Sequence, residues 1–134
     1  MEVPLALLAD YANTSQDGKL NVMGVFNRIL TKDFPTVHPE MRLVFRLEAQ
    51  PSERGRQATI EIKLLDADAN VLHHVKGRVG VPQKSLQPTI EINQILRLTG
   101  LVFKKPGDYR FDILVDGDLK ANVPFTLEQL PTSQ

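Results

Sequence analysis

The chain has 134 residues, of which 42% are hydrophobic, and its sixteen basic and sixteen acidic residues cancel at neutral pH. This size and composition predict one domain, residues 1–134, with a hydrophobic core. Zero net charge predicts no general attraction to nucleic acid or to an anionic membrane. The chain contains no cysteine, which excludes disulfides, thiolate metal sites and cysteine nucleophiles.

The first two apolar segments, residues 3–12 and 20–30, are predicted strands. The earlier one is apolar at both alternating positions, which indicates a strand covered on both sides or one near a sheet edge. No basic residue precedes it and no segment approaches the roughly 20 apolar residues of a membrane helix, so we expect a cytoplasmic protein. Asp17-Gly18 predicts a hairpin turn, and Gly24 indicates a bulge or a close backbone contact in the second segment.

Alternation of apolar and polar residues is clearest in residues 41–49, 58–65, 109–115 and 119–127. Apolar residues at every second position are typical of half-buried strands, because helices repeat every three to four residues. The residues predicted to face the core are Met41, Leu43, Phe45, Leu47, Ala58, Ile60, Ile62, Leu64, Tyr109, Phe111, Ile113, Val115, Leu119, Ala121, Val123, Phe125 and Leu127.

Two further segments, residues 71–81 and 89–98, alternate less regularly. The second changes phase at Ile95, which predicts a bulge near Gln94. Pro124 has no N–H for a sheet ladder, so the last strand is predicted to be an edge strand or to carry a bulge. These segments together predict an all-β fold, an antiparallel β-sandwich of about seven to nine strands.

Residues 107–111, Gly-Asp-Tyr-Arg-Phe, resemble the G-x-Y-x-C corner of immunoglobulin-like domains, with Phe111 at the cysteine position. In that corner the tyrosine hydroxyl bonds back to the backbone, so Tyr109 is expected to do the same. The chain lacks both cysteine and tryptophan, which removes the hallmarks of antibody domains and leaves the wider immunoglobulin-like class.

The whole chain resembles a family of uncharacterised bacterial or phage β-sandwich proteins. The resemblance lies in LLADYA (7–12), GKLNVMGVFNRI (18–29), MRLVFRLE (41–48) and PGDYRFDILVDG (106–117). It implies an immunoglobulin-like fold and a bacterial or phage origin. It implies no activity and supplies no site residues.

Asp66, Asp68 and Asn70 alternate as at the start of an EF-hand calcium loop. Such a loop needs glycine at its sixth position and glutamate at its twelfth, where this chain has Val71 and Gly77. The flanking segments also read as strands rather than helices. The stretch is therefore predicted to be a hairpin turn.

The same turn needs one residue with positive φ. Alanine is strained in that conformation, whereas asparagine tolerates it. Asn70 is therefore the predicted positive-φ residue, and Ala69 is the alternative.

Other polar residues also favour structural interpretations. The adjacent His73 and His74 point to opposite faces of a strand and cannot chelate one metal together; we expect one buried and one solvated. His38 stands alone in a predicted loop. Asp112 and Asp116, near Asp118, are about 13 Å apart along one strand, too far to act on one bond, so this acidic cluster is expected to be a solvated face with turn chemistry.

The sequence contains no nucleophile motif and no phosphate-binding glycine loop. Ser15, Ser52 and Ser85 have no local histidine partner. Segments 41–48 and 58–65, if paired as a hairpin, would share a surface of mixed charge. Its charged members would be Arg42, Arg46, Glu48, Glu61 and Lys63, beside Arg54 and Arg56.

We therefore predict no catalytic, cofactor-binding or metal-binding residues and no cofactor. The expected function is non-enzymatic and acts through protein contacts, by self-association as a homo-oligomer or as part of a larger assembly, with no nucleic-acid or membrane partner. Sheet edges and outward apolar side chains would make the contacts. The outward apolar candidates are Val44, Leu65 and Leu114.

The alternative is a module that binds a small ligand or carbohydrate through loops at one end of the sandwich. The candidate loops are residues 31–40, 51–57 and 82–88. Carbohydrate sites use exposed aromatic platforms, and these loops contain one aromatic residue, Phe34.

Overall fold

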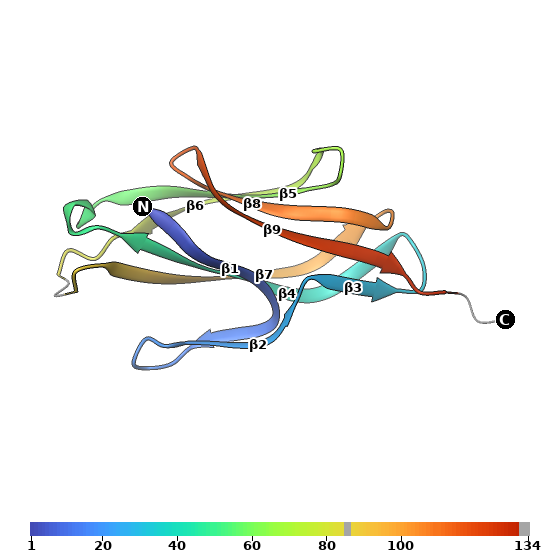
Figure 1. Ribbon diagram of the computed structural model, residues 1–134, viewed down its shortest axis with the longest axis horizontal. Helices are drawn as coiled ribbons and strands as arrows, with labels where there is room; N and C mark the ends of the chain where they lie inside the picture. Colours follow the sequence, from blue (N-terminus) through green and yellow to red (C-terminus); the bar gives the residue numbers. More distant parts are fainter. Residues whose placement is uncertain (85–86, 132–134) are drawn as a thin grey trace.

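The computed structural model describes residues 1–84 and 87–131, in which nine strands form two sheets (Figure 1). The first sheet has the order β2-β1-β4-β7 and the second has the order β3-β9-β8-β5-β6. The all-β prediction is confirmed. The strands are β1 (Glu2–Thr14), β2 (Leu20–Phe26), β3 (Arg28–Thr31), β4 (Thr36–Ala49), β5 (Gln57–Leu65), β6 (Val71–Gly80), β7 (Ile90–Phe103), β8 (Gly107–Val115) and β9 (Asp118–Gln129).

One strand pair departs from the predicted antiparallel arrangement. After β2 the chain crosses to the second sheet, where β3 runs parallel to the end of β9. The crossing is held by a hydrogen bond from the Thr126 N–H to the Asn27 carbonyl. Pro124 lies just before this parallel pairing begins, so its missing N–H falls where β9 pairs with β8 alone. β9 as a whole is an inner strand, between β3 and β8, so the edge-strand prediction is wrong, whereas the alternative, an irregularity in β9, is found as a register shift against β8.

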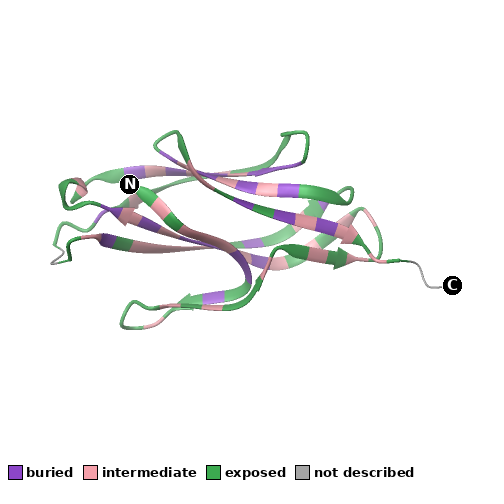
Figure 2. Ribbon diagram, in the orientation of Figure 1, coloured by how far each residue is buried: buried purple, intermediate pink, exposed green. Residues whose placement is uncertain are grey.

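The core lies between the two sheets, and alternate residues of the strands fill it (Figure 2). The inward positions predicted for β4, β5 and β8 are all buried. Leu119 is the exception among the predicted core residues, because 57% of it is exposed. A register shift between Ile113 and Leu114 in the β8–β9 pair accounts for this, since it moves Leu119 out of phase with the core residues of β9.

Residues 10–26 form a two-stranded arm that folds over the outer face of the first sheet. β1 pairs with β4 only as far as Ala9, and its remaining residues pair with β2 alone. Figure 1 shows β2 on the side of this sheet away from the second sheet. At the arm's tip, the Gly18 carbonyl accepts a hydrogen bond from the Asn93 side chain of β7 at 3.4 Å. The arm explains why Val44, which points outward, is 0% exposed.

Gly24 is the close-contact position within this arm. The β1–β2 register is the same on both sides of it, so the strand is not bulged there. Its φ is +72°, and an added Cβ would lie 2.5 Å from Asp10 Oδ2. Glycine is therefore favoured by the backbone conformation, and a larger residue would also have to displace the exposed Asp10 side chain.

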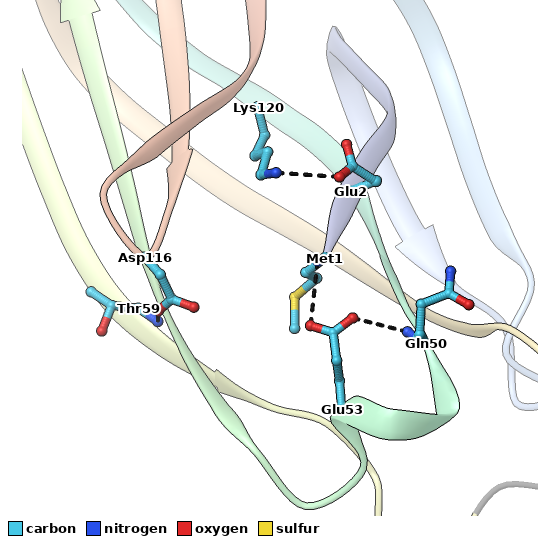
Figure 3. A network of polar contacts seen from close by, with 7 residues as sticks. All are labelled: Met1, Glu2, Gln50, Glu53, Thr59, Asp116 and Lys120. Atoms are coloured by element: carbon cyan, nitrogen blue, oxygen red, sulfur yellow. Dashed lines mark hydrogen bonds and ion pairs between the residues drawn. The ribbon is translucent and has the colours of Figure 1, made fainter.

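The link between β4 and β5 crosses from one sheet to the other through a 3₁₀ turn, Pro51–Glu53. The two strands are therefore not a hairpin, and their charged side chains do not form one mixed surface. The Glu53 carboxylate accepts the Gln50 N–H at 3.0 Å and lies 3.3 Å from the Met1 ammonium (Figure 3). These contacts tie the first residue of the chain to the crossing.

Candidate functional site: the β7 edge

The turn 66–70 is a backbone structure built around Asp66, which is 8% exposed. Asp66 Oδ1 accepts the N–H groups of Asp68 and Asn70, and Oδ2 accepts from the Asn70 side chain. The bond from the Asn70 backbone is the main reason that the pKa of Asp66 lies below its usual value. Both carboxylate oxygens serve the turn, so the alternating acids are explained without a calcium ion.

The positive-φ residue of this turn is Ala69, with φ +63°, and the prediction that favoured Asn70 is wrong. Asn70 is engaged through its N–H, its carbonyl and its side chain with Asp66. These bonds fix Asn70 as the last residue of the turn. The left-handed position therefore falls one residue earlier, on an alanine.

A hollow of about 580 Å³ opens between this turn and the β7–β8 connection. Three apolar side chains beside it, Val71, Leu72 and Val102, are about half exposed. Its cations are Lys104 and Lys105, and the Lys105 ammonium lies 3.8 Å from Asp68. None of the described residues in the three loops predicted to bind a ligand lines this hollow.

Tyr109 makes the predicted corner contact. Its hydroxyl donates to the Lys105 carbonyl at 2.5 Å. The ring packs edge-on against Phe103 with centroids 5.0 Å apart, and burial raises the pKa of the hydroxyl. Tyr109 therefore joins the β7–β8 connection to the core.

The histidines do not converge. His74 points outward and contacts Glu61 at 3.0 Å, while His73 faces the other way, and both are exposed. The expectation that one of them is buried is wrong. His38 lies against Phe26 and is partly buried, which lowers its pKa. Within residues 1–84 and 87–131, no three histidine or acidic side chains gather as a metal site would require.

The remaining polar candidates have structural partners. Asp112 contacts Arg110 at 3.2 Å, and Asp116 accepts the Thr59 N–H at 2.9 Å. The Ser15 hydroxyl bonds to Asp17 in the arm's turn. Ser52 lies in the 3₁₀ turn, and Ser85 lies outside the described residues.

The locally basic region is divided between β4, which carries Arg42 and Arg46, and the connection to β5. The Arg42 side chain is largely buried, with 12% of it exposed. Its guanidinium lies 5.3 Å above the Tyr11 ring and 3.2 Å from Glu40. Arg54 and Arg56 follow the 3₁₀ turn on the way to β5.

The predicted apolar contact positions are mostly covered. Besides Val44, Leu65 is only 7% exposed, and Leu114 is partly exposed. Exposed apolar side chains occur instead on the arm, where Tyr11 and Met23 lie opposite each other and are 46% and 67% exposed.

The predicted ligand loops are shorter than the sequence suggests. β3 ends at Thr31 and β4 begins at Thr36, so most of residues 31–40 is strand. The 3₁₀ turn takes up Pro51–Glu53 of residues 51–57, and residues 85–86 of the third loop lie outside the described part. In the described part of the chain, no helix is long and apolar enough to cross a membrane.

The longest open feature of the fold is the edge strand β7. It has 14 residues and pairs with β4 along its whole length, with no register shift, so the bulge predicted near Gln94 is wrong. Ile95 simply points outward, opposite Val44. On its other side β7 has no partner strand among the described residues. A groove of about 150 Å³ follows this edge, between β7 and β6, with Phe45, Ile60 and Ile62 among its lining residues.

Two charged side chains, Glu91 and Arg97, point outward from β7. Their side chains are 55% and 66% exposed. Glu91 lies 3.9 Å from Arg46, and Arg97 binds Glu40, which holds the pKa of Glu40 below its usual value. Sequence reasoning overlooked this pair, because the supposed bulge at Gln94 would have put them on different faces.

The fold and this site define a two-sheet, all-β protein that presents an open edge strand. The model of a family of unknown function, DUF6941, matches residues 4–128, and the chain belongs to this family. No curated protein matches it in sequence.

Among solved structures, the chain is similar to part of the DNA glycosylase AlkC of Pseudomonas fluorescens, at 16% identity and a TM-score of 0.44. This match covers 76% of the chain and 27% of the glycosylase. Another is a glycosyl hydrolase family 2 member from Bacteroides cellulosilyticus, at 10% identity and a TM-score of 0.38, covering 69% of the chain and 13% of that protein. The chain thus spans about a quarter or less of these proteins.

Proposed function

We propose that this protein is a non-enzymatic module that acts through protein–protein contacts, with β7 as its contact strand. The observation that carries the proposal is the 14-residue edge with no partner strand in the described part of the fold. Such an edge presents a row of unpaired N–H and C=O groups, which another strand can use to extend the sheet. The groove beside it supplies apolar surface for the side chains of that strand.

The non-enzymatic part of the proposal is supported by what the polar candidates do. Asp66, Asp116 and Tyr109 each bond to backbone groups of this chain. No three histidine or acidic side chains gather in the part of the chain that the structure describes, whereas the acid and base of a catalytic site meet in a pocket. Asp66 and Asp116 stabilise turns, and Tyr109 stabilises its corner.

The test uses a photo-crosslinking residue in the full chain, expressed in cells. Thr99 is exposed on β7, and Leu114, partly exposed on the central strand β8, is the matched control position. We expect protein adducts from position 99 and few from position 114. Equal yields from both positions, or no adduct from position 99, would contradict a contact role for β7.

We also propose that the sandwich is immunoglobulin-like, that the protein comes from a bacterium or phage, and that it works in the cytoplasm. The Tyr109–Lys105 bond supports the first point, because it repeats the tyrosine corner of that class. A cysteine-free, charge-balanced chain is compatible with the location. Cell fractionation of the tagged chain tests the location directly.

A second candidate function is the binding of a small ligand, favoured by the hollow of about 580 Å³ near Lys104 and Lys105. Its two cations and three half-exposed apolar side chains suit an anion with an apolar portion. A thermal-shift screen of carboxylates, sugars and divalent ions tests it. A shift that disappears in Lys104→Ala and persists in Lys120→Ala would support this function, and the absence of any shift would count against it.

A further inference from the structure

β7 differs from the other sheet edges in having little that blocks pairing. β6 carries Lys76 and Arg78 among its exposed residues and has a register shift at its start. Lysine and irregular register are the usual protections of an edge. β3 has four residues, and β2 contains the positive-φ Gly24. β7 is long, keeps one register against β4 and carries only two charges, of opposite sign; its positive-φ residue, Gly100, lies after the segment 90–98.

On the side that is already paired, each charge of β7 lies directly opposite a like charge and meets an opposite charge, Arg46 or Glu40, only diagonally along β4. Glu91 lies opposite Glu48 of β4, and Arg97 lies opposite Arg42. Like charges directly opposite each other weaken a strand pair, whereas opposite charges stabilise it. A strand on the free side that presents a cation to Glu91 and an anion to Arg97 would offset both mismatches.

β7 itself meets this requirement. Glu91 and Arg97 stand three residues before and three residues after Gln94. When two copies of β7 pair antiparallel with Gln94 facing Gln94, each Glu91 lies opposite Arg97 of the second copy. On the inward face, Ile92 then meets Leu96 and Ile90 meets Leu98.

We propose that β7 pairs with β7 of a second copy in this register, forming a two-fold symmetric dimer through a continuous eight-stranded sheet. The same patch is used on both subunits, as a two-fold interface requires. This inference rests on the proposed contact role of β7 and names its partner.

The neighbouring registers are less favourable. Centring the pair on Asn93 places Glu91 against Ile95 and Ile92 against Gln94. Centring it on Ile95 places Asn93 against Arg97 and Gln94 against Leu96. Registers shifted by one residue within the pair would put core-facing side chains on the outer face. Pairing about Gln94 matches both the charges and the apolar residues.

The arm leaves this edge accessible. Its tip reaches β7 through the Asn93 side chain, which points to the outer face of the sheet, and not through the backbone groups along the edge. Arg97 keeps free donors while it binds Glu40, because a guanidinium has five. The Glu91–Arg46 contact is long, at 3.9 Å, so Glu91 retains acceptor capacity.

The test measures dimer dissociation constants by analytical ultracentrifugation for the full chain and two charge-reversal variants. Glu91→Arg chains carry arginine at both positions, and Arg97→Glu chains carry glutamate at both. Each variant repels itself, so its dissociation constant should rise about tenfold or more. An equimolar mixture places arginine against glutamate at both pairs, and we expect a heterodimer about as tight as the parent dimer.

Lys76→Glu is the matched control, since it reverses an exposed charge on the other long edge strand, and it should dimerise like the parent. Each substitution also removes an ion pair within its own chain, with Arg46 or with Glu40, and mixing the two variants does not restore these pairs. Tighter association in the mixture can therefore come only from pairing between chains. A monomeric parent at every concentration, or a mixture no tighter than its components, would overturn the dimer. In that outcome, adducts of another protein at position 99 would still support the contact role of β7, so the two proposals can fail separately.

Discussion

Asp66 and Asn70 close the turn between β5 and β6 by bonding to each other in both directions. The Asn70 N–H donates to Asp66 Oδ1 at 2.9 Å, and the Asp66 N–H donates to the Asn70 carbonyl at 3.1 Å. The Asn70 side chain adds a bond to Asp66 Oδ2 at 3.1 Å. This mutual bonding leaves Ala69 in the left-handed conformation, with φ +63°.

Ala69→Gly should stabilise the protein by up to about 1 kcal/mol, because glycine removes the strain of positive φ and gives back part of the gain as unfolded-state entropy. Denaturant unfolding measures the change. Ala67→Gly is the control in the same turn, at a residue without positive φ, and should cost about 0.4–1 kcal/mol. Equal losses in both variants would show that Ala69 is not strained.

Tyr109→Phe should lower the free energy of unfolding by about 1–2 kcal/mol, because the Lys105 carbonyl loses its hydrogen bond while the ring stays packed. Thermal and denaturant unfolding measure it. Tyr11→Phe is the control, since this ring is 46% exposed on the arm, and it should change little. If both variants behave alike, the corner bond is not stabilising.

Asp66→Asn should lower the free energy of unfolding at neutral pH. The free energy of unfolding of the variant should also fall less steeply than that of the parent as the pH becomes acidic. The folded-state pKa of Asp66 is lowered by its bonds from Asn70, so its contribution is present above the unfolded pKa and is lost as the pH falls through the folded value. The gap between parent and variant should therefore close below about pH 4.

Melting temperatures measured from neutral to acidic pH check this prediction. Asp68→Asn serves as the control, because its carboxylate is 74% exposed and does not bond within the turn. A parent-to-variant gap for Asp66→Asn that stays constant as the pH falls would contradict the role given to its charge.

Gly24→Ala should cost about 1–2 kcal/mol, because alanine is strained at φ +72° and its Cβ would meet Asp10. Gly77→Ala on β6, where an added Cβ meets nothing within 4 Å and φ is not positive, should be neutral or slightly stabilising. Denaturant unfolding measures the free energies of unfolding of both variants and tests this difference. A neutral Gly24→Ala would mean that the arm adjusts freely at this point.

Alternation in the sequence predicted the inward faces of β4, β5 and β8 correctly, because side chains in a strand point to alternate faces whatever lies around them. The Tyr109 corner was also predictable, since its contact is local in sequence. Leu119 was not, because its exposure depends on a register shift against β8 that no alternation pattern reports.

The open edge could not be predicted from sequence, because it depends on the order of strands in the sheet. Ile95 suggested a bulge only because its outward position is apolar. The arm lies over that face of the sheet and buries Val44, the residue opposite Ile95. An apolar residue is therefore suited to an outward position there, and the apparent change of phase is not a change in the strand.

The central claim is that β7 makes contact by pairing with β7 of a second copy, and amide hydrogen exchange at increasing protein concentration tests this pairing most directly. We predict that exchange in residues 90–98 slows as concentration rises, while exchange in β6, the other long edge, stays constant. Exchange in residues 90–98 that does not change with concentration, or that slows equally in β6, would contradict the account.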